Sequence, residues 1–577
     1  MSKRYVVAVL LAAAFAPGAS AQWHVKDSPH DLSISGPGPV RSVAEGQVCV
    51  FCHAPHNASP DAPLWNRWSA QRHYRIYESS TTDARIDQPR GKSKLCLSCH
   101  DGVLAVGLVR SRGEADRIET TIQRLQKEHG GLGTDLSDDH PIGFRYDRAL
   151  VNADSQLRYP DQISQNLPLG KHGWMECTTC HDAHNNRLGD FLRVTDRQSA
   201  ICVSCHELNG WRACVHANSS FPVRGRLVDP AETLPYPTVA DNGCGNCHTI
   251  HSARQPERLL RFRAEEQNCL NCHGGGGSLF NILSQVRKRS AHNPRKYVGI
   301  HDAAEDSRSA RTHVECADCH NPHAVRSSPV ADALVQTLSA PRPVPGELQY
   351  VTGVSQSGRM LERARYEYEV CLKCHSGNMR APRPTVTRQV DSNDVRRQFL
   401  TANESFHPVF AVGRNPDVPS LRGRLNRNSV IACTDCHNSD DARAVGGSGP
   451  DGPHGSIYSP LLGRNYTIRD QAAESPAAYA LCYECHSRSS ILNNESFPLH
   501  RLHVATAQAP CATCHAAHGV VRSGRGGDHT HLINFNVSVV ERSDVARDIR
   551  FDDTGRLRGT CTLRCHGFNH ENVTYQR

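Results

Sequence analysis

The chain has 577 residues, of which 38% are apolar and 6% aromatic, and its 66 Lys and Arg exceed its 58 Asp and Glu to give a formal net charge of +8. This length allows several ordinary domains, but apolar side chains are too few to fill the cores of all of them. No segment after the N-terminal leader is long and apolar enough to cross a bilayer, so we expect no membrane span in the mature chain.

Residues 1–21 are typical of a secretory signal peptide. Lys3 and Arg4 give a charged start, residues 6–16 an apolar stretch, and residues 19–21 (Ala-Ser-Ala) a cleavage site. The apolar stretch is too short for a membrane anchor, and no Cys follows the cleavage site to carry a lipid. We therefore expect an exported protein, in the periplasm or at the outer-membrane or extracellular face.

Eleven Cys-x-x-Cys-His motifs and one Cys-x-x-x-Cys-His motif use 24 of the 25 cysteines. In such a motif the two thiolates bond the vinyl groups of a haem c, and the His that follows binds the iron as the proximal ligand. Zinc sites and disulfide scaffolds also use paired cysteines, but neither requires a His directly after the second Cys. We therefore expect twelve haem c groups, the twelfth on an irregular spacing. In chain order, the predicted sites are Cys49, Cys52 and His53; Cys96, Cys99 and His100; Cys177, Cys180 and His181; Cys202, Cys205 and His206; Cys244, Cys247 and His248; Cys269, Cys272 and His273; Cys316, Cys319 and His320; Cys371, Cys374 and His375; Cys433, Cys436 and His437; Cys482, Cys485 and His486; Cys511, Cys514 and His515; and Cys561, Cys565 and His566.

The remaining histidines can supply the second axial ligands. Twelve proximal His leave 22 of the 34 His, and twelve six-coordinate irons need twelve of these. Five motifs continue as Cys-His-x-x-His, and the second His must serve a neighbouring iron because both cannot bind one iron from opposite faces. His140 and His407 each precede Pro, which removes a competing N–H and disfavours helix. The expected distal ligands are His30, His56, His140, His184, His216, His251, His292, His323, His407, His454, His503 and His518, with His301, His313, His500, His529, His531 and His570 in reserve.

Sequence alone does not assign each distal His to an iron. The ninth motif lacks the His-x-x-His extension, so its neighbour is expected to receive a distant His, and His454 is the candidate. The leftover Cys214 is either a small buried residue or a reactive thiol near a haem, and we favour the buried residue.

The net charge does not indicate nucleic acid as a partner. Removing Lys3 and Arg4 with the leader leaves +6 (8 − 2). Twelve oxidised bis-His haems, each about −1 with its two propionates, would bring the whole to roughly −6. Many Lys and Arg are then expected to face propionates.

The expected fold is a haem-packed chain of mostly irregular loops with short α-helices and minimal β structure, in an elongated multihaem cytochrome c architecture. Residues 114–128 have Ile118, Ile122 and Leu125 at helical spacing, which predicts an amphipathic helix. Residues 532–540 alternate as in a strand, with extended coil as the alternative. The Pro-rich stretch 340–346 is the best linker, and it would divide an N-terminal lobe (22–340, haems 1–7) from a C-terminal lobe (347–577, haems 8–12).

The sequence resembles the paired-CxxCH multihaem cytochromes of metal-reducing bacteria. The likeness is carried by residues 28–33 (SPHDLS), 49–58 (CVFCHAPHNA), 139–141 (DHP), 177–184 (CTTCHDAH), 316–323 (CADCHNPH) and 452–456 (GPHGS). It implies exported, low-spin, bis-His haems that transfer electrons, often toward extracellular metal oxides or partner cells. That family includes periplasmic carriers, cytochromes threaded through outer-membrane porins and filament-forming cytochromes. Cys214 and the spacing of Cys561 and Cys565 depart from its pattern.

Three functions follow as hypotheses. The first is a conduit that transfers electrons along twelve bis-His haems in anaerobic respiration or extracellular electron transfer, with other periplasmic or outer-membrane cytochromes as partners and a metal oxide as a possible terminal acceptor. The second is a multihaem reductase with one five-coordinate catalytic haem that acts on a small nitrogen or sulfur oxyanion. The third is a subunit of a porin complex or a self-assembled filament. No residue is assigned a catalytic role.

Overall fold

The computed structural model describes most of the mature chain. The described residues are 25–60, 62–69, 71–112, 115–223, 227–229, 233–297, 299–302, 305–306, 312–328, 339–377, 385–524 and 527–576. The predicted signal peptide lies outside these residues. The chain divides into two compact units: the N-terminal unit contains the residues up to 196 together with 200–205, and the C-terminal unit contains 197–199 and the residues from 206 onward. The predicted lobe boundary at 340–346 stays a prediction.

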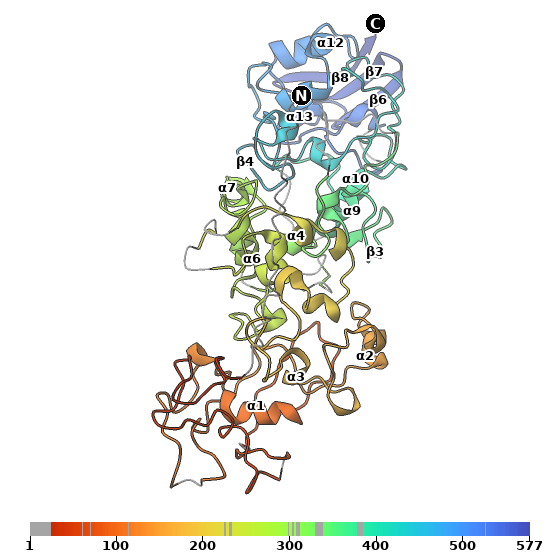
Figure 1. Cartoon of the computed structure of the whole chain (residues 1–577). Coiled ribbons are helices and arrows are strands. Elements are labelled where there is room, and N and C mark those ends of the chain that lie inside the picture. The colour runs from red at the N-terminus through yellow and green to blue at the C-terminus, as the bar shows by residue number, and fades with distance from the viewer. Residues whose placement is uncertain are drawn as a thin grey trace, which may run out of the picture. The chain divides into compact units, whose positions relative to one another are not determined.

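Short helices joined by long irregular segments make up both units (Figure 1). The N-terminal unit contains α1 (Lys92–His100), α2 (Arg148–Ala153) and α3 (Cys177–Cys180). The C-terminal unit contains α4 (Val215–Asn218), α5 (Val239–Asn242), α6 (Glu265–His273), α7 (Ile282–Val286), α8 (Cys316–Cys319), α9 (Glu367–His375), α10 (Val395–Gln398), α11 (Ala480–Cys485), α12 (Arg488–Leu492), α13 (Cys511–Cys514) and the π-helical turn η13 (Leu502–Thr506). Most of the 3₁₀ turns span three residues, and attachment motifs lie on η5 (Cys202–Ser204), η7 (Gly243–Asn246) and η11 (Cys433–Asp435).

The described apolar side chains form several small clusters. In the N-terminal unit, Phe144, Tyr146 and Met175 are the centre of one of them. In the C-terminal unit, Tyr368 and Phe410 lie in another. This agrees with the lean apolar composition, and motif cysteines such as Cys433, Cys205 and Cys514 pack against these clusters.

The C-terminal unit ends in a four-stranded antiparallel sheet. Its central strand β7 (Arg558–Cys565) pairs with β5 (Val540–Glu541), β6 (Arg550–Gly555) and β8 (Phe568–Gln576). Two two-stranded pairs occur elsewhere in the unit, β1 (Ser290–Ala291) with β4 (Gly455–Ser456), and β2 (Gly353–Val354) with β3 (Met360–Leu361). The short helices, small sheets and abundant loops match the expected fold class, but the C-terminal sheet is more β structure than the sequence indicated.

Two local predictions were wrong. The described part of 114–128 is not an α-helix, because its backbone bonds to other loops: the N–H of Ile118 donates to Gly107, and Thr120 bridges Ser42. Ile118 packs on Phe51 and Val109, so its apolar spacing reflects burial at separate points. The strand expected over 532–540 is limited to β5 at its end, and the preceding residues form a 3₁₀ turn and isolated bridges.

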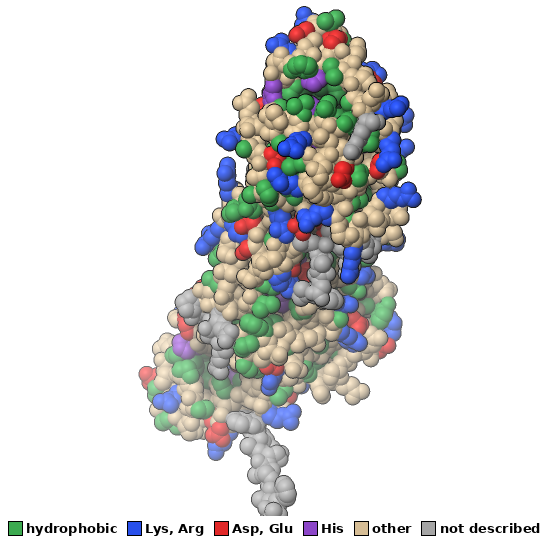
Figure 2. All heavy atoms as spheres, turned by 90° about the horizontal axis from the view of Figure 1, so that it is seen from above, with side chains coloured by type: hydrophobic (Ala, Val, Ile, Leu, Met, Phe, Trp, Pro, Cys, Tyr) green, Lys and Arg blue, Asp and Glu red, His purple; other side chains and the backbone are tan. Residues whose placement is uncertain are grey.

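Within the described residues, no helix combines the length and apolar character needed to cross a membrane. On the face drawn in Figure 2, Lys and Arg side chains are scattered among neutral ones and form no single patch.

Candidate haem sites

Many regular motifs share one local conformation. In α3, α8 and α13 the two cysteines begin and end a four-residue helix, and the His that follows is extended. The N–H of that His donates to the carbonyl of the first Cys in seven motifs, at 2.8–3.0 Å. One helical turn therefore brings the two thiols together, and the extended residue turns the imidazole away from them. The motifs with this bond begin at Cys49, Cys177, Cys244, Cys316, Cys433, Cys482 and Cys511.

Three other motifs lie at the end of a longer helix. The second, sixth and eighth motifs close the nine-residue helices α1, α6 and α9, and the proximal His is the last helical residue in each. In α9 the second cysteine, Cys374, precedes His375 directly, and the two are the last residues of the helix. Its thiol lies near Cys319 of the seventh motif, where it helps to raise the pKa of that cysteine. Haem attachment at Cys374 stays a prediction, and the helix gives it the same spacing from Cys371 as in the four-residue helices.

A backbone carbonyl orients many proximal imidazoles. The Nδ1 atoms of six proximal His lie 2.6–3.1 Å from such a carbonyl, those of His100, His181, His248, His320, His437 and His515. When Nδ1–H donates to a carbonyl, Nε2 carries the lone pair that binds a metal. This hydrogen bond thus prepares each ring as an iron ligand.

Three of these carbonyls belong to residues with a strained backbone conformation. Asp190, Arg258 and His531 have φ values of 45°, 61° and 54°, in the left-handed region that costs energy for residues other than Gly. Each of these three residues presents its carbonyl to a proximal His. Two residues further along the chain, an apolar residue forms an isolated bridge with that same His, as Leu192 does with His181. This feature was not predicted from sequence, although similar apolar pairs follow the third and fifth motifs, in 191–193 (Phe-Leu-Arg) and 259–261 (Leu-Leu-Arg).

Eight proximal His face a second His ring. The ring centroids of these pairs are 6.0–6.4 Å apart. Two imidazoles that bind one metal from opposite sides, each with a metal–nitrogen distance of about 2.0 Å, have centroids roughly 6.3 Å apart. The spacing therefore fits two axial ligands of one iron. The pairs are His53–His184, His100–His30, His248–His323, His273–His216, His320–His454, His375–His292, His437–His518 and His515–His500.

The proximal His206 of the fourth motif has a different setting from these eight. It is half-buried and comes directly after Cys205, at the start of the C-terminal unit. Its imidazole is close enough to His323, the ring that faces His248 of the fifth motif, to help lower the pKa of that distal histidine. The structure thus places His206 beside the fifth site, and its role as an iron ligand stays a prediction.

Two more proximal His interact with groups other than a facing proximal or distal ring. His181 of the third motif acts electrostatically on His30. His486 of the tenth motif has its Nδ1 2.9 Å from the hydroxyl of Ser420, and burial together with the nearby His407 lowers its pKa to about 4. His407 is thereby placed near the tenth motif, and its role as a distal ligand stays a prediction.

Seven of the twelve predicted distal ligands lie in the facing pairs, and three of the seven come from His-x-x-His extensions. His500, held in reserve by the sequence reasoning, faces His515. His454 faces His320 of the seventh motif and not a neighbour of the ninth. The reason is that His454 directly precedes β4, which pairs with the distant strand β1.

Other predicted or reserve histidines have different surroundings. His56 is exposed, and His140 has its Nδ1 3.2 Å from the carbonyl of Pro141. His251 is exposed in the loop after the fifth motif. His503 faces His570, and neither directly follows a cysteine pair. The carboxylates of Glu315, Asp318, Glu305 and Asp553 hold the reserve residues His301, His313 and His531, and His529 is buried with its Nδ1 2.9 Å from the carbonyl of Ile533.

Burial lowers the pKa of several of the paired imidazoles. It lowers the pKa of His30 to about 4, and the facing His100 lowers it further. Burial and the facing proximal ring likewise lower the pKa of His323 and His454 to about 3. A neutral imidazole is the form that binds iron, so these sites are ready for a metal near pH 7.

The cysteines place the motifs in sequence order within each unit. When the motifs are taken in pairs (first and second, third and fourth, and so on), the second cysteines of the two motifs in a pair are electrostatic neighbours. Between one pair and the next, most of the first cysteines of the adjoining motifs are hydrogen-bonded. A hydrogen bond between the side chains of Cys96 and Cys177 raises the pKa of Cys96 well above its usual range. Burial beside Cys99 raises the pKa of Cys52 to about 12. The other neighbours are Cys180–Cys205 in the N-terminal unit, and Cys247–Cys272, Cys269–Cys316, Cys319–Cys374, Cys371–Cys433, Cys436–Cys485, Cys482–Cys511 and Cys514–Cys561 in the C-terminal unit.

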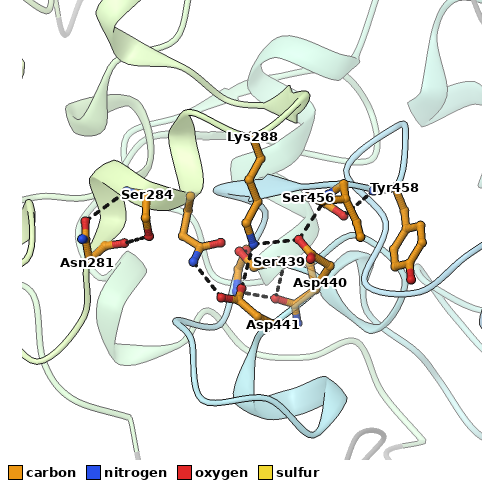
Figure 3. A network of polar contacts seen from close by, with 12 residues as sticks. Asn281, Ser284, Lys288, Ser439, Asp440, Asp441, Ser456 and Tyr458 are labelled. Carbon is orange, nitrogen blue, oxygen red and sulfur yellow. Dashed lines mark hydrogen bonds and ion pairs between the residues drawn. The ribbon is translucent and has the colours of Figure 1, made fainter.

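A polar network in the C-terminal unit positions two distal histidines (Figure 3). The Nζ atom of Lys288 lies 2.7 Å from an oxygen of Asp440 and 3.0 Å from one of Asp441. This ties the segment after α7 to the loop after the ninth motif. There Ala291 pairs with Gly455, so His292 and His454 stand beside the same two-stranded pair. Their partners His375 and His320 belong to consecutive motifs.

The leftover Cys214 is fully buried, and its thiol donates to the carbonyl of Pro322 at 3.3 Å. Burial raises its pKa, so it is a weak nucleophile. The structure thus agrees with a packing role.

These residues together fit haem c. None of the 25 cysteines, all of which are described, forms a disulfide, and the 24 motif cysteines are at least partly exposed, so their thiols can form thioether bonds. The imidazoles of the facing pairs are spaced for one metal between each pair. By contrast, the buried Arg67 is not available to a propionate, because its guanidinium donates to Ser98, Val106 and Ala105.

Comparison with known proteins gives two matches. Residues 171–209 and 237–277 match the family described as Doubled CXXCH motif, and these are the two stretches whose motif pairs have identical spacing. The multiheme cytochrome MtrA of Shewanella baltica (strain OS185) is 24% identical over 163 residues, which cover 26% of this chain and 36% of that protein. The alignment therefore spans about a third of the length of this relative.

Proposed function

We propose that this member of the paired-CxxCH multihaem cytochromes is a dodecahaem conduit that carries electrons along a series of bis-His haem c sites. Bound haem c supplies an iron that alternates between ferric and ferrous states and so holds one electron at a time.

The single observation that carries the proposal is the set of facing imidazoles. In eight motifs His rings stand on both sides of the expected iron position, at ring separations of 6.0–6.4 Å. A site with two protein ligands has no vacancy for a substrate, which suits electron transfer and not turnover of a small molecule. Two His ligands also favour lower potentials than His with Met.

The order of the motifs supports a continuous path. Neighbouring motifs in sequence are neighbours in space through their cysteines, from the first to the fourth motif in one unit and from the fifth to the twelfth in the other. The His-x-x-His extensions add to this, because His184, His323 and His518 each serve a different motif from the one they follow. Each such segment therefore ties two sites together.

Export and redox partners are part of the proposal. The leader and the family favour the periplasm or the outer-membrane or extracellular face, where the partners are other cytochromes and, at the end of the path, an acceptor such as a metal oxide. A porin complex or self-assembly is compatible with the same path.

Two matched variants test the proposal. His454→Ala should leave the haem count unchanged but convert one haem to high spin, since His454 faces His320. His301→Ala is the control, because carboxylates and not a proximal His surround that ring. Visible and EPR spectra with haem counted on the same sample give the readout. A His454→Ala protein that stays entirely low-spin would show that the facing rings do not ligate one iron.

A further inference from the structure

The twelfth motif is built on a strand. Cys561 and Cys565 lie on β7 opposite Phe551 of β6 and Val540 of β5. Side chains four residues apart on a strand point to the same face, whereas side chains three apart point to opposite faces. The extra residue in Cys-x-x-x-Cys therefore keeps both thiols on one face, where they pack with Leu563 and the eleventh motif's Cys514.

His566, which follows the second Cys, is placed unlike the regular proximal ligands. It lies in the turn between β7 and β8 with a φ of 49°. Its Nε2 is 3.0 Å from both carboxylate oxygens of Asp470. The carbonyl-bound proximal rings keep Nε2 free for a metal, so the nitrogen that would bind iron is already engaged at His566.

His570, and not His566, lies beside the midpoint between the two cysteines of the twelfth motif. It lies on β8 directly opposite Leu563, the residue midway between the two cysteines. Residues directly opposite in an antiparallel pair share a face, with Cβ atoms about 4.5–5.5 Å apart. The His570 side chain therefore rises from the sheet between Cys561 and Cys565.

His503 faces His570 with the geometry of a ligand pair. Their ring centroids are 6.3 Å apart at 28°, within the range of the eight other pairs. The Nδ1 of His503 lies 2.9 Å from the carbonyl of Leu499, which leaves its Nε2 for a metal. The ring is presented by η13, and π-helical turns are frequent at functional sites.

We infer that the haem on Cys561 and Cys565 takes His503 and His570 as its axial ligands, and that His566 instead anchors the β7–β8 turn through Asp470. The inference rests on the proposed haem-binding function. It also couples the last two sites, because His500 faces His515 of the eleventh motif and lies three residues before His503.

The test uses the full-length mature holoprotein with three single variants. Haem is counted by intact mass, the peptide bearing both cysteines is weighed for its haem, and low-temperature EPR gives the spin states. His503→Ala and His570→Ala should each keep the wild-type haem count and gain one high-spin ferric haem. His566→Ala should give no high-spin signal. His570→Met, which restores a ligand, should return that haem to low spin with a Met–iron absorption band.

Three results would overturn the inference. One is a high-spin haem in His566→Ala together with entirely low-spin His503→Ala and His570→Ala proteins. The second is no spin change in any variant. The third is a wild-type peptide without haem on either cysteine. The proposed function is judged separately, because its failure would remove the low-spin signals of the other eleven sites in the unmodified protein.

Discussion

The regular motifs and the twelfth motif hold their cysteines and ligands on different backbone. In the seventh motif a four-residue helix, α8, brings Cys316 and Cys319 together, and the ring of the next residue, His320, faces that of His454. In the twelfth, the strand β7 spaces the cysteines by four residues, and the ring between them comes from the neighbouring strand. The comparison teaches that the number of residues between the two cysteines follows the repeat of the helix or strand that holds them. A motif on a strand can therefore keep both cysteines and take its iron ligand from a residue other than the His that follows them.

The two kinds of site also differ in what stabilises them. The sheet has its own packed cluster, with Phe535, Val540, Phe551 and Leu563 buried together. Many regular motifs lie in loops held by single bridges and by the carbonyl–imidazole bonds. Their stability should therefore depend more strongly on bound haem.

The largest expected effect is from preventing haem attachment altogether. Chain produced without haem c maturation should lose most amide protection around the regular motifs, because their facing rings and thiols would have nothing between them. Residues 540–576 should lose less, since their hydrogen bonds run between strands. Hydrogen exchange measured by mass spectrometry on both forms gives the comparison. Equal protection in the two forms would contradict it.

Removing one attachment site should have a local effect. Cys49→Ala should lower the haem count by one and leave the other sites low-spin, because each predicted haem has its own attachment motif. Intact mass and visible spectra measure the loss, with Cys214→Ser as the control at a cysteine outside the motifs. Loss of every haem would show that the sites are not modular.

Gly455→Ala should disturb two ligands at once. A Cβ at Gly455 would overlap the carbonyl oxygen of Gln285 in α7, so β4 would have to move away from the end of that helix. Such overpacking costs about 1–3 kcal/mol. Guanidinium unfolding followed at the haem absorption band measures it, and Gly46→Ala, where nothing lies within 4 Å of the new Cβ, is the control. Equal midpoints for the two variants would mean that the pair does not support His292 and His454.

Lys288→Met should have a smaller effect in the same network. It leaves the mostly buried Asp440 without its cation, at an expected cost of about 1–2 kcal/mol. Burial alone would lower the pKa of Lys288, but its hydrogen bonds to Asp440 and Asp441 outweigh this and raise it. The contribution is therefore complete at neutral pH and is lost only as pH rises past the ordinary lysine range. An unfolding midpoint that does not move at pH 7 would rule out a stabilising role.

The smallest effect is expected at an exposed ion pair between residues that belong to no motif. Arg148 and Asp161 lie 3.2 Å apart with side chains 66% and 65% exposed. Arg148→Gln should change the unfolding free energy by less than about 0.5 kcal/mol. A larger change would indicate that surface charge contributes to the stability of the N-terminal unit.

The attachment triads could be predicted from sequence because their covalent chemistry fixes local spacing. His184, His323 and His518 could be proposed as distal ligands because they sit at a fixed offset from a proximal His, and each faces another proximal His in the structure. The partner of each ring could not, because it depends on how distant loops return. The pairing of His454 with His320 is set by the contact of β1 with β4, which joins residues far apart in sequence.

The local errors have the same physical origin. Residues 118 and 122 have helical spacing, but the backbone partners of this segment lie in other loops, and tertiary hydrogen bonds override a weak local preference. Nothing in the sequence ranks His500 with His503, because it is the turn η13 and the residues just before it that present the two rings to different histidines.

The most direct test of the central claim is low-temperature EPR of the oxidised, mature protein with haem counted on the same sample. The account predicts twelve haems, all low-spin, because every iron has two His ligands. A stoichiometric high-spin ferric signal would mean that one iron is open, and it would contradict a pure electron conduit in favour of a reductase for a small oxyanion.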